Sequence, residues 1–224
     1  MLDDMTTAKR QGRPPSAETP AALPDILSKA LKMFAEKGFE GTSVAALNRE
    51  LGVSHNLIHQ RFGSKEGLWY AAVDFAFGEV HEQITVDTEL AERDLMEAAR
   101  QTIVRFLVSH ARRPELLRLV TVEGATLSAR LTYLHEVHVQ PLYARLTEFL
   151  KVLVDCDVLN AAEVRSLHFL VAHGGTAPFS LVPFALMLEP DDPTEPAAIE
   201  HHAEFVADML IAGLRARVAA RETS

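Results

Sequence analysis

Polar side chains with hydrogen-bonding capacity gather within residues 55–60 of this 224-residue chain: His55, Asn56, His59 and Gln60. Imidazole and carboxamide groups offer both donors and acceptors, and these side chains are short enough to be held firmly. At helical spacing they fall on the face opposite Ile58 and Phe62, which lie one turn apart. A narrow polar face of this kind is suited to reading the edges of DNA bases.

The surrounding residues predict two short helices joined by a tight turn. The apolar face of the first helix consists of Val44, Leu47 and Leu51. Gly52 follows at once, at a point where a helix ends readily in a left-handed residue, and Ser54 can cap the second helix. This pattern predicts a helix-turn-helix with its polar face on the second helix. The alternative interpretation is an ordinary helical hairpin with a solvated outer face.

The flanking residues make the prediction more specific. Residues 24 to 75 resemble the tetracycline-repressor (TetR) family of regulators. The matching positions are Phe34-Ala35-Glu36-Lys37-Gly38-Phe39, Thr42-Ser43-Val44, Gly52-Val53-Ser54, Phe62 and Ser64-Lys65-Glu66. The resemblance implies an all-α fold, in which an N-terminal helix-turn-helix DNA-binding domain precedes a helical ligand-binding and dimerisation domain. The domains expected are a flexible basic arm over 1–22, the DNA-binding domain over 23–70 and the second domain over 71–224.

The resemblance also implies roles for individual residues, although the sequence departs from the family pattern within residues 56–59. We predict that the outer face of residues 55–60 selects sequence and that Thr42, Ser43, His59 and Lys65 mainly hold phosphates. The family usually has a tyrosine at the position of His59. The ring of His59 can donate the corresponding hydrogen bond to a phosphate only in a suitable tautomer. Leu57 either meets a thymine methyl group or packs against the preceding helix.

The first 22 residues have too little apolar surface to fold alone, and they carry Arg10 and Arg13 beside glycine and proline. We interpret them as a basic arm that enters a narrow, A·T-rich minor groove, where negative potential is focused. The alternative is a solvated tail.

Net charge does not contradict DNA binding. The formal charge is −9, but residues 1–70 hold nine Lys/Arg against eight Asp/Glu, while residues 71–224 hold 13 against 23. The acidic residues are therefore concentrated away from the predicted reading helix, where they discourage indiscriminate binding to DNA.

Catalytic and metal-binding patterns are weak in this sequence. It contains no glycine-rich phosphate loop, no G-x-S-x-G elbow and no dinucleotide fingerprint, so we expect no enzyme and no cofactor. His135 and His138 lie three apart and share a helix face, which leaves a metal site with His168 or His173 as a second interpretation. We favour core or surface roles and predict no metal. The single cysteine, Cys156, is expected to be a small buried side chain rather than a redox sensor.

The rest of the chain has helical periodicity. A helix from Ser64 carries apolar stripes on two sides, so it should be buried on both and connect the two domains. After a loop at about 85–90, helices are expected over 92–111, 114–130, 131–154, 161–188 and 197–219. Gly174, Gly175 and Pro178 should interrupt the fourth of these, and the prolines of 189–196 indicate a loop.

A looser similarity to one TetR subgroup extends over the C-terminal half. It implies that residues 161–188 and 197–219 pair with a second subunit in a four-helix bundle, while the helices between enclose a pocket. Polar residues and aromatic walls on otherwise apolar faces are the candidate ligand contacts, with core or interface roles as the alternative: Phe106, Glu123, Tyr133, His138, Phe169 and His173.

These observations predict a ligand-responsive transcriptional regulator, a repressor released from its operator by a largely apolar small molecule. The expected partners are double-stranded operator DNA, the effector and a second copy of the chain. The alternative is an all-helical sensor or adaptor that does not bind DNA. Because no signal peptide opens the chain and no apolar run approaches the ~18 residues that span a bilayer, we expect a cytoplasmic protein without a membrane partner.

Overall fold

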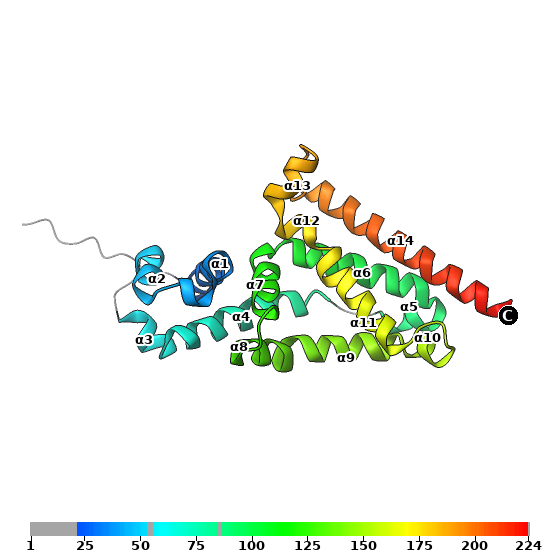
Figure 1. Ribbon diagram of the computed structural model, residues 1–224, viewed down its shortest axis with the longest axis horizontal. Coiled ribbons are helices and arrows are strands. Elements are labelled where there is room, and N and C mark those ends of the chain that lie inside the picture. The colour runs from blue at the N-terminus through cyan, green and yellow to red at the C-terminus, as the bar shows by residue number, and fades with distance from the viewer. Residues whose placement is uncertain (1–21, 53–55, 85–86, 224) are drawn as a thin grey trace, which may run out of the picture.

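The computed structural model describes residues 22–52, 56–84 and 87–223, and within these ranges every regular element is a helix (Figure 1). The N-terminal elements are α1 Leu23–Gly41, α2 Val44–Leu51, α3 Leu57–Phe62 and α4 Lys65–His81. The following elements are α5 Thr88–Arg93, α6 Leu95–Ala111, α7 Pro114–Gly124, α8 Ala129–Tyr133, the π-helical turn η1 Leu134–Val139, α9 Gln140–Phe149 and α10 Lys151–Asp155. The last are α11 Ala161–Phe169, the π-helical turn η2 Leu170–Gly174, α12 Ala177–Ser180, α13 Val182–Leu188 and α14 Pro196–Glu222. The all-α fold with an N-terminal helix-turn-helix is thus confirmed.

Local signals explain the helix-turn-helix. The Ser43 hydroxyl accepts a hydrogen bond from the amide of Ala46 at 3.1 Å and so caps α2. Gly52 ends α2 at φ +64°, in the left-handed region predicted for it. In α3, Ile58 is fully buried and Phe62 is half-buried against the same apolar cluster. The predicted cap Ser54 lies outside the described residues.

Helix α4 is buried on two sides, as predicted. It joins the N-terminal helices α1–α3 to the second part of the molecule, which the helices after α4 form. Ser64 caps it by accepting from the amide of Gly67 at 2.9 Å. The apolar cluster around Trp69 contains side chains of α1, α2 and α3 but also Leu116 and Leu119 of α7 and Leu134 of η1. One core therefore runs across the expected boundary between residues 70 and 71.

After α4, several helices begin or end at other residues than the sequence predicted. Short helix α5 occupies part of the expected loop, and a break at Asp94 separates it from α6. The break has a local cause, because the Asp87 and Asp94 carboxylates cap α5 and α6 by accepting from the amides of Leu90 and Glu97 at 2.9 and 3.0 Å. Helix α7 similarly ends at Gly124, and Ser128 caps α8.

The helix expected over 131–154 is divided into α8, η1, α9 and α10. Pro141 cannot donate to the carbonyl one turn earlier, and its ring clashes there in a regular helix. The π-helical turn η1 lies directly before it and accommodates this proline. The predicted interruption at 174–178 is confirmed, since η2 and the short α12 and α13 replace a continuous helix there.

The last helix, α14, lies along α6 (Figure 1). A second apolar cluster brings Ala99 of α6 together with Ile211 and Leu214 of α14 and with Val164 of α11. Within the described residues, no single helix has the length and apolarity to cross a membrane, and one bent pair, 161–180 with 182–188 at 79°, meets that test only when its parts are combined.

Candidate DNA-binding surface and effector cavity

The outer face of α3 displays the predicted reading side chains. Asn56, His59 and Gln60 are exposed, whereas Leu57 is partly buried against the core cluster. Packing of Leu57 on the preceding elements, one of its two predicted roles, is therefore what the structure shows for it. His55, Arg10 and Arg13 lie outside the described residues.

The ring of His59 is oriented by its own helix end. Its Nδ1 lies 3.1 Å from the carbonyl oxygen of Gly63, so a neutral ring donates from Nδ1 and leaves Nε2 as an acceptor. Nε2 could then accept from a base amino group, but it could donate to a phosphate only if the ring became protonated. In this tautomer His59 is better suited to base reading than to its predicted phosphate contact.

Two predicted phosphate contacts have partners inside the protein. Thr42 is fully buried, and its hydroxyl donates to the carbonyl of Gly38 at 2.8 Å, so the hydroxyl does not reach the surface in this conformation. The Lys65 ammonium donates to the carbonyls of Phe39 and Thr42 at 2.9 and 3.0 Å. These bonds stabilise the end of α1 and fix the start of α4 against it. One donor of Lys65 is left over, and Ser43 remains exposed at the start of α2.

A cavity of about 210 Å³ lies in the second part of the molecule. Helices α4, α6, α7, α9, α11 and α14 contribute to its walls, together with η1 and η2. The aliphatic and aromatic lining includes Phe77, Ile103, Phe106, Leu117, Val120, Leu142, Leu146, Phe149, Leu167, Val171, Leu210 and Leu214. Such a lining is typical of a small-molecule site.

Two of the six predicted ligand contacts, Phe106 and His173, line this cavity, whereas His110, Arg145 and His168 were missed. A sequence signal for His110 existed, because it continues the spacing of Ala99, Ile103 and Phe106 along one face of α6. Arg145 and His168 gave no comparable signal.

The other four predicted contacts do not line the cavity. Glu123 is buried but accepts from Arg130 Nε at 3.0 and 3.1 Å. Tyr133 donates to Asp74 at 2.7 Å, and the Nε2 of His138 lies 2.9 Å from the same carboxylate. Phe169 is 55% exposed and stacks on His173 from outside. None of the four lines this cavity, and their contacts are those of the core or interface role that the sequence had left open.

Burial keeps the cavity's histidines neutral near pH 7. It lowers the pKa of His110 to about 4, although the bond from Nδ1 to the Phe106 carbonyl at 2.8 Å opposes this shift. Burial also lowers the pKa values of His168 and His173. Neutral imidazoles can exchange hydrogen bonds with a ligand without the cost of a buried charge.

His135 and Cys156 are both exposed. Among the described residues, no three His, Cys, Asp or Glu side chains are grouped as a metal site. Cys156 is exposed, which corrects the expectation that it is buried. It follows the last residue of α10 and precedes Asp157, a non-glycine residue with φ +56°, after which Val158 and Leu159 enter the second apolar cluster.

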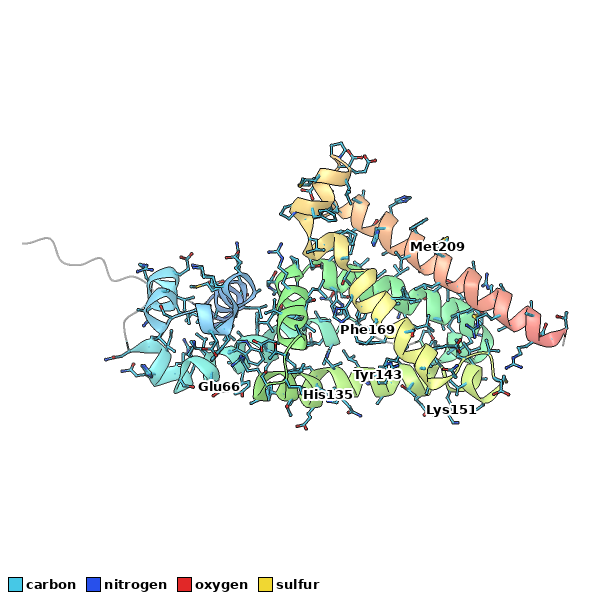
Figure 2. All side chains as sticks on the ribbon, viewed as in Figure 1. Glu66, His135, Tyr143, Lys151, Phe169 and Met209 are labelled. Atoms are coloured by element: carbon cyan, nitrogen blue, oxygen red, sulfur yellow. The ribbon has the colours of Figure 1, made fainter. Side chains whose placement is uncertain are left out.

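An apolar surface remains uncovered on the C-terminal helices. The exposed large side chains there belong to η2, α13 and α14 or to residues beside them: Phe169, Leu170, Leu181, Phe184, Leu186, Met187, Leu188, Phe205 and Met209. Figure 2 shows Phe169 and Met209 on α11 and α14 respectively. An exposed apolar patch of this kind marks an interaction surface.

Comparison with known proteins agrees with this geometry. The family model described as bacterial regulatory proteins, tetR family, matches residues 26–72. The chain is 25% identical over 162 residues to the HTH-type transcriptional dual regulator CecR of Shigella flexneri, covering 67% of this chain and 72% of that protein. It is 38% identical over 66 residues to the HTH-type transcriptional repressor ComR of Escherichia coli K12, a match that spans 30% of either protein.

Solved structures share the fold of this chain over most of its length. A mutant of the protein HlyIIR aligns with a TM-score of 0.58 and 22% identity, covering 80% of this chain and 94% of that one. The TetR family transcriptional regulator PfmR of Thermus thermophilus aligns with a TM-score of 0.55 and 23% identity, covering 84% of this chain and 97% of that one. The chain thus carries the helix-turn-helix of the bacterial regulatory proteins of the tetR family over residues 26–72, and it shares its overall fold with these solved structures.

Proposed function

We propose that this DNA-binding regulator is a homodimeric repressor that leaves its operator when a small molecule occupies the cavity. The observation that carries the proposal is helix α4. Its first residue, Lys65, is bonded to the carbonyls of Phe39 and Thr42 in the helix-turn-helix domain, and Phe77, three turns later, is a wall of the cavity. One helix thus belongs to both the DNA-reading part and the ligand-binding part.

Further contacts link the cavity to α4 and α1. His138 of η1 stacks on Phe77 with ring centroids 4.3 Å apart, next to cavity residue Val139. Arg130 of α8 is held by Glu123, and its guanidinium lies 4.0 Å from the centre of the Phe39 ring. A ligand that moves η1 or Phe77 would therefore shift α8 and the end of α1.

For DNA recognition, we assign base reading to Asn56, His59 and Gln60 of α3 and phosphate contacts to Ser43 and the remaining donor of Lys65. Arg10 and Arg13 of the arm remain proposed minor-groove contacts. One six-residue helix reaches too few bases for high specificity, so a two-fold dimer reading two half-sites is required. The uncovered apolar side chains of α13 and α14 supply the surface for that dimer.

The alternative function, a helical sensor without DNA binding, has less support. A solvated face unrelated to DNA would not need the base-reading types that α3 exposes, and the matched regulators are named for transcriptional control. The family consists of DNA-binding regulators, and we propose that this protein is not an enzyme and acts in the cytoplasm, where operator DNA is found.

A binding assay tests the repressor proposal. The full chain is used to select sequences from fragmented genomic DNA, and the selected duplex is titrated by fluorescence anisotropy at two salt concentrations. We expect a roughly palindromic site bound by a dimer, and an effector that lowers the affinity about 5- to 150-fold. Failure to enrich any sequence would favour the sensor, and an effector that tightens binding would contradict release.

A further inference from the structure

The polar lining of the cavity has one sign of charge. Among the described residues that line it, none is Asp or Glu, and the polar side chains are Thr102, His110, Arg145, His168 and His173. The surrounding sequence is acidic, since residues 71–224 hold 23 Asp/Glu against 13 Lys/Arg. The cavity lining therefore contains no acidic side chain, although acidic residues outnumber basic ones in this part of the sequence.

Arg145 of α9 supplies the positive charge of this lining. Four other arginines of the second part are paired with carboxylates: Arg100 with Asp208, Arg113 with Glu79, Arg130 with Glu123 and Arg217 with Glu163. Among the described residues, Arg145 forms no ion pair and no side-chain hydrogen bond. Its guanidinium fork is therefore available to an anion from outside the chain.

The histidines of the lining differ in the hydrogen-bond donors that they leave free. His110 of α6 uses its Nδ1 donor on the Phe106 carbonyl, so its other nitrogen can only accept and offers nothing to an anion. His168 and His173 lie on α11 and η2, and no hydrogen bond within the described residues occupies their ring nitrogens. The ring of Tyr143 on α9, which is labelled in Figure 2, lies 5.4 Å from the His168 ring of α11 between centroids, so α9 and α11 approach each other. Arg145 and His168 thus lie on the neighbouring helices α9 and α11, and His173 lies on η2, which continues α11.

We propose that the cavity binds a small anionic amphiphile, an apolar body with one carboxylate, and that Arg145 holds the carboxylate with His168 and His173 as further donors. The proposal rests on the proposed function only in taking this cavity as the effector site. A volume of about 210 Å³ exceeds the ~150 Å³ that holds a benzene ring and lies below the ~300 Å³ of drug-sized sites. Medium-chain or one- to two-ring carboxylic acids therefore fit best.

The test compares ligands that share a body and differ in the head group. Decanoate, decanamide and decylamine, and likewise 4-phenylbutyrate and its amide, are titrated into the full chain by calorimetry without DNA. A charge-assisted bond to Arg145 should make at least one acid bind about tenfold more tightly than its amide, or roughly 1.4 kcal/mol. The amine should bind more weakly than the amide, because Arg145 repels it.

Variants then assign the preference to a residue. Arg145→Gln should remove the difference between acid and amide while the amide still binds, which reports an intact cavity. Arg145→Lys should keep part of the difference, because a point charge remains but the bidentate fork is lost. Arg165→Gln removes an exposed arginine of α11 that does not line the cavity, and should keep the full preference.

Two outcomes would overturn the inference: no acid binds more tightly than its amide, or the preference survives in Arg145→Gln. The result for the proposed function is read separately, by titrating operator DNA with and without the acid. An acid that binds through Arg145 but leaves operator affinity unchanged would support the ligand class and contradict ligand-induced release. Operator binding without any preference for the acid would support the DNA-binding regulator and contradict the proposed ligand class.

Discussion

Gln60 and Lys65 are both polar residues near the DNA-reading helix, but their surroundings differ. Gln60 is exposed on α3, whereas the ammonium of Lys65 is bonded to two backbone carbonyls. Gln60→Ala should cost on the order of 1–3 kcal/mol of operator binding and relax preference at particular base pairs, because base contacts specify sequence. The measurement is affinity for the operator and for its single-base variants, with Asn56→Ala as a parallel case.

Lys65→Met should instead weaken binding to all sequences alike and lower the free energy of unfolding by roughly 1–3 kcal/mol, because two charge-assisted hydrogen bonds are lost. Denaturant unfolding and salt-dependent DNA titration check both effects. The control is Lys32→Met, at an exposed position on α1. A Lys65 variant of unchanged stability that altered base preference would reverse these roles.

His110 gives the protein a pH-dependent stability. Its pKa is lowered by burial to about 4 in the folded chain, against 6.5 as the ordinary value. Between these values the unfolded chain binds a proton that the folded chain does not, so the free energy of unfolding falls as pH falls, by roughly 3 kcal/mol in total. His110→Gln should flatten this decline in urea titrations from pH 7 to pH 4. The matched control is His135→Gln, at an exposed position, and an unchanged slope in His110→Gln would contradict the assignment.

At the scale of elements, the join between α3 and α4 depends on Gly67. A Cβ at this position would overlap the carbonyl oxygen of Phe62, the last residue of α3. Gly67→Ala should therefore displace α3 from α4, lower stability by about 1–3 kcal/mol and weaken operator binding. The control lies in the same helix, because a Cβ on Gly78 meets no atom within 4 Å.

Gly78→Ala should stabilise α4 by about 0.5–1 kcal/mol, since alanine is the better helix former. Thermal unfolding and operator titration of the two variants make the comparison. Equal behaviour of the two would show that the close approach at Gly67 does not position α3.

At the scale of the whole molecule, dimerisation should depend on the uncovered face of α14. Phe205 and Met209 are 58% and 63% exposed and lie one helical turn apart. Replacing both by Glu should give a folded monomer, because like charges would meet across a two-fold interface. Operator affinity should fall by at least about 100-fold, since the two reading helices would no longer bind together.

Light scattering and operator titration measure the two effects. Leu127→Glu, at a 95% exposed residue in the loop between α7 and α8, is the control for adding charge at an exposed leucine. A dimer that persists in the double variant would place the interface elsewhere.

The sequence by itself determined the features with local causes. The left-handed Gly52, the start of a helix at Ser64, the two-sided burial of α4 and the interruption near Pro178 all follow from residues within a turn or two of each other. The break at Asp94 and the π-helical turn before Pro141 also have local causes, but their signals compete with an uninterrupted apolar period, so the sequence predicted longer helices there.

Only the tertiary structure decided which polar side chains reach the cavity. Tyr133 and His138 share Asp74, about 60 positions earlier in the chain, and are drawn to α4 instead of the cavity. Arg145 lies in the lining, and among the described residues no carboxylate pairs with it, whereas distant carboxylates pair with other arginines. Helical periodicity gives the face on which a side chain lies, but the element packed against that face comes from elsewhere in the chain, and that element sets the partner.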